Sequence, residues 1–242
     1  MKSIIICEGS TDYVLLQYFM RAAFRWQDYG PAPEKRFKRS RVLKRGTDYL
    51  TIGESGGSSQ LIPCLDYMLE LNSISAETEA YENLVIVTDR DEIGTEQEFI
   101  DRIKSVLINR GIQLNENNVG NNQWIDCQHR NGHGKKIEYR LLLLVIPFEE
   151  TGAMETFLLN AISSTDTYDA DIIRKGNDFV DHIDPEKRYL SKRRYMTKSK
   201  FDVYFSVRTA ADQFTERQNI LKNVKWEEYI AIQESFSKLG EL

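Results

Sequence analysis

Cysteine, proline and long apolar runs are all scarce in this sequence of 242 residues. Its three cysteines, Cys7, Cys64 and Cys127, are odd in number and far apart, which is typical of reduced thiols rather than of a disulfide framework. The longest aliphatic run, residues 141–146, is far shorter than the roughly 18 residues that a membrane helix needs. The apolar stretch at the N-terminus is too short for a signal peptide. We therefore expect a cytoplasmic protein with no membrane partner.

Two catalytic patterns are absent as well. The chain has no GxxxxGK[ST] nucleotide-binding loop and no GxSxG nucleophile turn, so neither a P-loop ATPase nor a serine hydrolase of that type is encoded. With 41% hydrophobic and 29% charged residues, the composition is that of an ordinary globular chain. The length predicts one large domain, or one domain with an appendage.

Acidic residues are missing from two windows of an otherwise acidic chain, residues 35–45 and 187–200, and each window carries seven basic residues. Because the net charge of the chain is -5, the residues outside these windows are strongly acidic. Basic windows that also contain Phe37, Tyr189 and Tyr195 could bind DNA or RNA through phosphate contacts and base stacking. The alternative is a pair of solvated loops. The candidate nucleic-acid-binding residues are Lys35, Arg36, Lys38, Arg39, Arg41, Lys192, Arg193, Arg194 and Lys198.

An apolar strand-like run is followed by an amphipathic helical pattern three times in succession: residues 3–7 and 10–26, 49–52 and 59–71, and 83–88 and 96–109. We expect another strand over 138–148 and another helix over 152–162. A polar loop over 111–134 contains one short strand at 124–127. This order predicts an α/β fold whose mainly parallel sheet is flanked by helices.

The C-terminal part is charged and periodic, which predicts helices over 201–214 and 225–239. We therefore expect a catalytic domain over residues 1–165. A helical extension over 166–242 packs on it to form one compact unit.

Acids follow two of the predicted strands. Glu8 comes directly after the first strand with Asp12 four residues later, and Asp89 and Asp91 come directly after another. The carboxyl ends of parallel strands meet at one edge of a sheet, and alternate residues of an extended segment point the same way. Four carboxylates in one small volume would recruit a hard cation such as Mg²⁺ or Mn²⁺.

Each acid also has a structural explanation. Asp12 could favour a helix dipole, Asp89 and Asp91 could cap the following helix, and Glu8 could be a lone exposed acid. The combination favours a site, because EG directly follows one apolar strand and DxD directly follows another.

The segments IIICEGSTD and LVIVTDRDEIG resemble the two signature motifs of Toprim domains, which occur in topoisomerases, bacterial primases, ribosomal-RNA maturases and OLD-family nucleases. The resemblance covers roughly residues 2–165 and implies a Toprim-like fold. It also implies that Glu8 acts in acid/base chemistry or metal binding, and that Asp89 and Asp91 hold Mg²⁺. Gly9 and Gly94 stand where the family pattern has glycine.

Within that family the sequence is most similar to OLD-type nucleases and to small stand-alone Toprim-like proteins. The resemblance implies that Asp12 is a second acid of the site and that Glu155, in GAMET, is a further one, although Ala153 stands where those nucleases have serine. Glu155 could equally be a helix N-terminal acid. A phosphate-contacting lysine is implied near the C-terminus, with Lys200 as the first choice and Lys198 as the second.

The function implied is that of an endonuclease, a phosphodiester hydrolase with one or two Mg²⁺ or Mn²⁺ ions. Glu8, Asp89 and Asp91 would hold the first ion, and Asp12 and Glu155 the second. OLD-type nucleases carry an ATPase domain, so a separate ATPase or another protein is an expected partner, and family habit suggests a role in phage defence. The alternative is a non-catalytic Toprim-like module that binds nucleic acid or protein. A zinc site at Cys127, His129 and His133 is a further alternative that lacks a fourth ligand.

Overall fold

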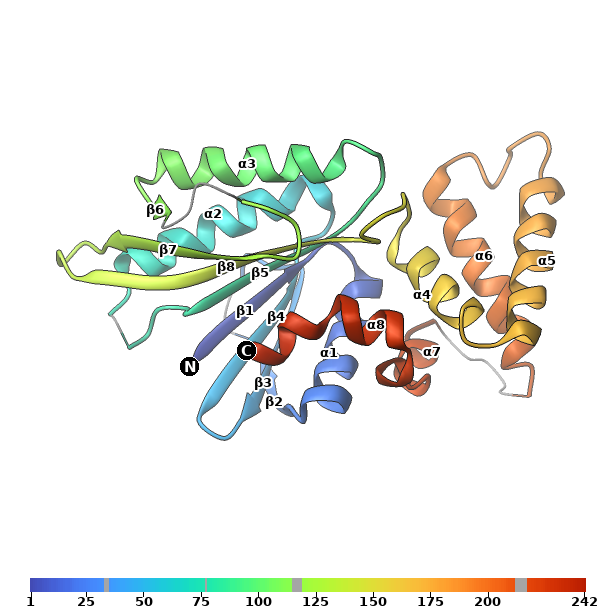
Figure 1. The fold of residues 1–242 in the computed structure, drawn as a ribbon, viewed down its shortest axis with the longest axis horizontal. Helices are drawn as coiled ribbons and strands as arrows, with labels where there is room; N and C mark the ends of the chain where they lie inside the picture. The colour runs from blue at the N-terminus through green and yellow to red at the C-terminus, as the bar shows by residue number, and fades with distance from the viewer. Residues whose placement is uncertain (33–34, 77, 115–118, 212–216) are drawn as a thin grey trace.

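The computed structural model describes residues 1–32, 35–76, 78–114, 119–211 and 217–242. Over these ranges the chain forms one sheet with helices on both faces, and a group of helices beyond one end of the sheet (Figure 1). The eight strands run in the order β2-β3-β4-β1-β5-β8-β7-β6 across the sheet. Their bounds are β1 (Lys2–Cys7), β2 (Gln27–Pro31), β3 (Arg39–Arg45), β4 (Asp48–Glu54), β5 (Asn83–Asp89), β6 (Gln113–Leu114), β7 (Trp124–Arg130) and β8 (Lys136–Ile146).

The α/β class is confirmed, but the prediction of a mainly parallel sheet is wrong. Within the described ranges, the three pairings among β4, β1, β5 and β8 are parallel, and the other four pairings are antiparallel. The antiparallel strands lie at the two edges. On one edge β2 and β3 extend the sheet beyond β4, and on the other β7 and β6 extend it beyond β8. Residues 39–45 of the first basic window therefore form β3, a strand between β2 and β4, rather than a loop.

Eight α-helices and two short 3₁₀ helices complete the described part of the chain. The α-helices are α1 (Ser10–Phe24), α2 (Ser58–Ile74), α3 (Thr95–Asn109), α4 (Met154–Ser163), α5 (Thr167–Ile183), α6 (Arg193–Arg208), α7 (Arg217–Asn223) and α8 (Ile230–Ser235), and the 3₁₀ helices are η1 (Trp226–Glu228) and η2 (Ser237–Glu241). None of the described helices combines the length and the apolarity that crossing a membrane requires.

Several predicted elements have different bounds in the structure. The sequence pattern missed α5 and placed the start of α6 eight residues too late, at 201 instead of 193. The end of that predicted helix, 212–214, and part of the predicted loop, 115–118, lie outside the described residues. The short strand expected at 124–127 is longer and forms β7.

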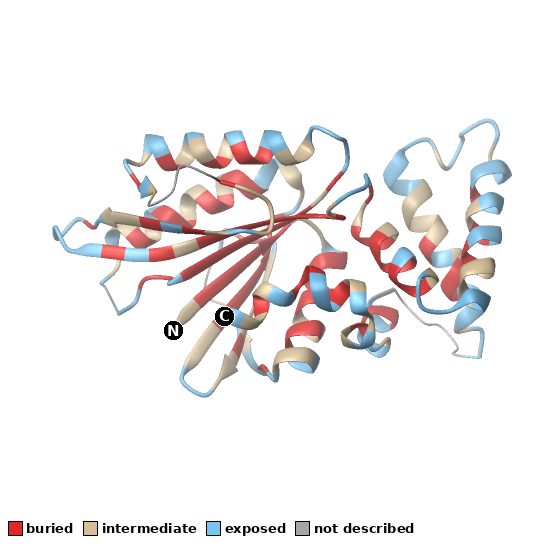
Figure 2. Cartoon of the chain, in the orientation of Figure 1, coloured by how far each residue is buried: buried red, intermediate tan, exposed pale blue. Residues whose placement is uncertain are grey.

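The central strands are buried on both faces, as Figure 2 shows, because apolar residues face the helices on either side. In β1, Ile4 and Ile6 pack on the side of α2 and α3, whereas Ile5 and Cys7 pack on the side of α1 and α4. This alternation is the period of two that a strand imposes. The buried run ends with Cys7, and Glu8, directly after the strand, is partly exposed.

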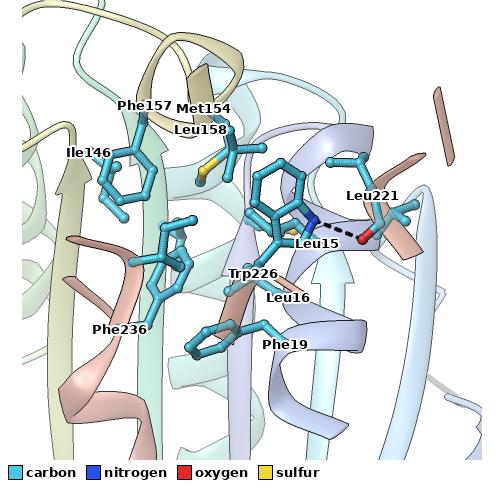
Figure 3. Close-up of a cluster of buried hydrophobic side chains, with 14 of the residues drawn as sticks. Leu15, Leu16, Phe19, Ile146, Met154, Phe157, Leu158, Leu221, Trp226 and Phe236 are labelled. Carbon is cyan, nitrogen blue, oxygen red and sulfur yellow. Dashed lines mark hydrogen bonds between the residues drawn. The ribbon is translucent and has the colours of Figure 1, made fainter. Parts of the chain in front are cut away.

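The C-terminal segment covers the α1 and α4 face of the sheet. Trp226 and Phe236 are fully buried in a cluster with Phe19 of α1 and Met154 of α4 (Figure 3). The indole N–H of Trp226 donates to the carbonyl oxygen of Leu221 at 3.0 Å, which satisfies its only polar atom. Residues of the predicted catalytic part and of the predicted extension therefore share one apolar cluster. This packing holds α4 at the end of the sheet where β1 and β5 finish (Figure 1).

Candidate functional site

Three neighbouring parallel strands bring an acid to the same edge of the sheet. β4 ends at Glu54, β1 is followed directly by Glu8, and β5 ends at Asp89. The register pairs Cys7 with Glu54 on one side and with Val87 on the other, so the three strand ends lie side by side. Adjacent strands are about 4.8 Å apart. Acids that are far apart in the sequence therefore become neighbours.

Two helices begin at this edge and contribute the other acids. Asp12 lies in the first turn of α1, and Glu155 lies in the first turn of α4. The start of α4 is fixed to the end of β5, because the backbone N–H of Met154 donates to Asp89 Oδ1 at 2.9 Å. Glu155 is thereby held next to the strand that supplies Asp89.

One cavity of about 360 Å³ collects these side chains. Asp12 and Glu155 are each 3% exposed, so they lie deep in the wall, whereas Asp91 is exposed. All five predicted carboxylates line this cavity, together with one that was not predicted: Glu8, Asp12, Asp89, Asp91, Glu155 and Glu54. The structure thus brings the predicted acids to one place.

Most of the buried carboxylates also accept a hydrogen bond from the protein. The hydroxyl of Thr88 donates to Glu8 Oε2 at 2.9 Å, and the hydroxyl of Thr11 donates to Glu155 Oε1 at 2.8 Å. The backbone N–H of Gly9, the N-cap residue of α1, donates to Asp12 Oδ2 at 2.9 Å. Asp12 therefore also stabilises the start of α1, whereas Asp89 contacts the start of α4 and not, as the structural explanation had it, the helix that follows it in the sequence, α3.

The cavity carries more negative charge than its surroundings can easily solvate. Burial, followed by the charges of Glu155 and Glu8, raises the pKa of Asp12 to about 8 despite the hydrogen bond from Gly9. Burial likewise raises the pKa of Asp89 well above its ordinary value, with the charge of Asp12 as the next cause. Burial also raises the pKa of Glu8. Carboxylates in this situation either keep a proton or attract a cation.

The donor chemistry suits a hard divalent cation, because every ligand that the acids offer is an oxygen. As the side chains are placed, however, no group of three or more His, Cys, Asp or Glu residues in the described ranges forms a metal-ligand set. The hydrogen bonds from Thr88, Thr11 and Gly9 hold carboxylates against the walls. Side-chain rotation would be needed for several of them to reach one ion.

Cations surround the acids. Lys38 of the first basic window and Arg193, Arg194 and Lys198 of the second line the same cavity. The side chain of Lys38 is 66% exposed, and Arg193 and Arg194 are exposed, in contrast to the buried Asp12. The cavity therefore has an acidic floor and a basic rim, and the rim is built from segments about 150 positions apart in the chain.

The other predicted cations lie elsewhere or have other partners. Lys200 pairs with Asp181 of α5 at 2.8 Å and does not line the cavity. Lys198 is two residues away on α6, and residues two apart on a helix point in nearly opposite directions. Of the remaining predicted residues, Arg36 contacts Gln60, Arg39 pairs with Glu54, Arg41 pairs with Asp28, and Lys35 and Lys192 are exposed.

The zinc alternative finds little support in the geometry. Cys127 and His129 lie two residues apart on β7, whereas His133 lies in the turn that follows. Cys127 is buried among the apolar residues on the α2 and α3 face. In the part of the chain that the structure describes, these residues form no metal-ligand set.

Sequence reasoning missed Glu54 and the two threonines. Glu54 ends an apolar strand just as Asp89 does, so the pattern LTIGE carried the same signal, but the glycines that follow favoured a loop interpretation. Thr11 and Thr88 had no motif of their own. Their role appears only when β1, β5 and α4 are brought together in space.

Fold and site together define an α/β protein with an acidic cavity at the carboxyl edge of its parallel strands. The sequence model of the family described as "Protein of unknown function (DUF3226)" matches residues 2–238, and the chain belongs to this family. No curated protein matches the chain.

Solved structures add a likeness of fold. The hypothetical protein PH0156 from Pyrococcus horikoshii OT3 is 19% identical with a TM-score of 0.52, and the match covers 99% of this chain and 92% of that one. At this identity the likeness concerns the fold alone. A putative glyoxalase family protein from Bacillus anthracis is 15% identical over 59% of this chain and 93% of its own, with a TM-score of only 0.19, and carries no argument.

Proposed function

We propose that this protein is a metal-dependent phosphodiester hydrolase, a Toprim-type nuclease that acts on DNA or RNA and uses Mg²⁺ or Mn²⁺. The observation that carries the proposal is the cavity itself. It collects acids from β1, β5, α1 and α4 on its floor and cations from both basic windows on its rim. A polyanion needs the rim for approach, and a hard cation needs the floor for binding.

The roles of the residues follow from their positions. Glu8, Asp89 and Asp91 would hold one ion at the ends of β1 and β5, and Asp12 and Glu155 would hold a second at the starts of α1 and α4. When bound, such ions activate a water molecule and stabilise the departing oxygen of a phosphodiester. Thr88 and Thr11 orient Glu8 and Glu155 through their hydroxyl groups. The rim cations neutralise the phosphate charge.

The Toprim assignment rests on the two segments at the ends of β1 and β5. The structure supports it by placing Glu8 and Asp89 at neighbouring parallel strand ends. Ala153, at the N-cap of α4, leaves that position without the serine hydroxyl of the OLD-type pattern. By the same resemblance we propose a separate ATPase or another protein as partner, and a role in phage defence.

A second candidate function is a non-catalytic module that binds nucleic acid or protein. The specific observation in its favour is that the described carboxylates form no metal-ligand set as they are placed, and that most accept hydrogen bonds from the protein. In this case the rim would still bind phosphates, but no bond would be cleaved.

One experiment separates the two functions. Plasmid, single-stranded DNA and RNA are incubated with Mg²⁺, Mn²⁺ or EDTA, and the wild type is compared with Glu8→Gln and Asp89→Asn. Glu98→Gln is the matched control, because Glu98 is an exposed acid of α3, away from the cavity, that pairs with Arg102. The proposal predicts metal-dependent cleavage that both site variants lose by at least about 100-fold. Binding of nucleic acid without cleavage would support the second candidate, and cleavage that survives in both variants would remove the site.

A further inference from the structure

Glu54 differs from the other acids of the cavity in its ion-pair partners. It is 2% exposed, and both of its carboxylate oxygens face cations. Lys38 Nζ lies 3.4 Å from Oε1, and Arg39 Nε lies 2.5 Å from Oε2. A metal ion at Glu54 would have to displace both cations. Glu54 is therefore a poor metal ligand and a good anchor for a cation.

The backbone and stem of Lys38 are also fixed. Its backbone N–H donates to the carbonyl oxygen of Glu54 at 2.9 Å, directly before β3 begins. Its methylene stem passes over Gly56, where an added Cβ would lie 3.8 Å from the stem. Phe37, the preceding residue, is buried against Gly53. The lysine is thus held to β4 by its backbone, its neighbour and its ammonium group.

The ammonium group of Lys38 keeps capacity for an anion. A lysine has three N–H donors, and within the described residues this ammonium group pairs with Glu54 alone. The side chain is 66% exposed and lines the cavity that holds the acids. Arg39, by contrast, lies over the ring of Tyr13 at 4.9 Å and does not line the cavity. Of the two cations on Glu54, Lys38 alone faces the site.

We propose that Lys38, positioned by Glu54, contacts the phosphate group that binds at the acidic cavity. The ligand class is a phosphodiester of a nucleic acid, and this step rests on the proposed function. Lys38 takes the role that the family resemblance assigned to Lys200, which pairs with Asp181 instead. Lys38, whose backbone is bonded to β4, is held more rigidly to the acids than the rim residues of α6 are, because β4, β1 and β5 are joined by continuous hydrogen bonding.

The test compares Lys38→Ala, Lys38→Arg and Glu54→Gln. The matched control is Lys44→Ala, because Lys44 belongs to the same basic window but pairs with Tyr49 at the opposite end of β3 from Glu54. Binding of a labelled oligonucleotide, single-stranded and duplex, is measured with Mn²⁺ at several salt concentrations. Cleavage is measured under single-turnover conditions, and binding of Mn²⁺ alone is measured by calorimetry.

Lys38→Ala is expected to weaken oligonucleotide binding about tenfold and to reduce the salt slope by about 0.7 to 0.9, the value of one phosphate contact. Its cleavage rate should fall about 100-fold. Its affinity for Mn²⁺ alone should stay equal or increase, because a positive charge is lost near the ion. Lys38→Arg should retain part of the binding, and Lys44→Ala should behave as the wild type.

Glu54→Gln tests the positioning role. It should lower binding and cleavage in the same direction as Lys38→Ala, and the double variant should be no worse than Lys38→Ala alone, because Glu54 acts through Lys38. Additive losses in the double variant would contradict positioning.

The outcomes for the two proposals are distinct. If the wild type cleaves but Lys38→Ala matches Lys44→Ala in oligonucleotide affinity, salt slope and cleavage rate, the proposed phosphate contact of Lys38 is wrong and the nuclease function stands. If the wild type binds without cleaving and Lys38→Ala still weakens binding, the phosphate contact stands and the nuclease function is wrong. If the wild type binds no oligonucleotide, both are wrong.

Discussion

Replacing Asp12 by asparagine removes an ionisable carboxyl group from the buried floor of the cavity and keeps the shape of the side chain. The asparagine oxygen can still accept the hydrogen bond from Gly9, so the start of α1 should be preserved. The carboxyl group that is lost faces Glu155, Glu8 and Glu54. The substitution therefore measures how much the crowding of carboxylates at this site lowers the free energy of unfolding.

The direction and size of the effect follow from the pKa of Asp12, which burial raises from 3.8 to about 8. Between these values the folded protein binds more protons than the unfolded chain, so the free energy of unfolding falls as the pH rises. One proton gives a slope of about 1.4 kcal/mol per pH unit, or about 4 kcal/mol between pH 5 and pH 8. Without metal, Asp12→Asn should lose this one-proton contribution to the slope, so its stability should fall less steeply with pH, and it should be more stable than the wild type by about 2 to 4 kcal/mol at pH 8.

A bound cation should make the wild type more stable than Asp12→Asn, the reverse of the order without metal. Saturating Mn²⁺, at about 100 times its dissociation constant, adds about 2.7 kcal/mol to the free energy of unfolding of a protein that binds it. This gain should be larger at pH 8 than at pH 5, because protons compete with the ion for the carboxylates. Asp12→Asn should gain less than the wild type.

Urea unfolding measures these differences, with the fluorescence of the buried Trp26 and Trp226 as the signal. The series is run at pH 5 and pH 8, in EDTA and in Mn²⁺, with Asp101→Asn on the exposed face of α3 as the control. Equal pH slopes in wild type and Asp12→Asn, or a less stable Asp12→Asn at pH 8 in EDTA, would refute the reasoning.

Two further substitutions test neighbouring parts of the site. In the wild type, the hydroxyl of Thr88 donates to Glu8 and thereby lowers the pKa of Glu8. Thr88→Val removes this hydrogen bond, so the acid limb of the pH–rate profile of cleavage should move up by about one pH unit. An unmoved limb would show that Glu8 does not titrate in the reaction. Gly53→Ala places a Cβ 2.7 Å from ring carbons of Phe37. The clash should lower the free energy of unfolding, measured in urea, by about 1 to 3 kcal/mol, and should weaken oligonucleotide binding because it shifts the neighbouring Lys38. A variant as stable as the wild type would show that Phe37 moves freely.

The sequence predicted the centre of the fold well, because its strands are fully buried and its acids stand at strand ends. The apolar runs of β1 and β5 are continuous, and the helical patterns after them are strong. The edges could not be predicted in the same way. β2 is mostly exposed and β3 is largely charged, so neither shows the apolar pattern that marks a strand. Their antiparallel pairing, and that of β7 with β8, makes the sheet mixed.

The C-terminal helices were predicted only in part. In α5 the buried residues Ile173, Gly176 and Val180 recur at spacings of three and four, so the sequence did contain a helical pattern that was overlooked. The cap at Asp166, which accepts from the N–H groups of Tyr168 and Asp169, was a second available signal. Extending α6 back to residue 193 would also have shown that Lys198 and Lys200 cannot face the same cavity.

Which site residues could be predicted from the sequence depended on how the strands pair in the sheet. Glu8 and Asp89 were predicted as neighbours because both follow buried strands. Glu54 was missed because the glycines after it favoured a loop interpretation, and its ion pairs with Lys38 and Arg39 were missed because the antiparallel pairing of β3 with β4 was not foreseen. The partner of each carboxylate depends on contacts between distant segments, which no local pattern encodes.

The most direct test of the central claim is anomalous diffraction from crystals of the protein equilibrated with Mn²⁺. The account predicts an ion at the cavity, with carboxylate oxygens of Glu8 and Asp89 about 2.1 Å away and their present hydrogen-bond partners Thr88 and Met154 released or shared. A cavity without an anomalous peak at saturating Mn²⁺, or a peak held only by residues outside it, would contradict the account.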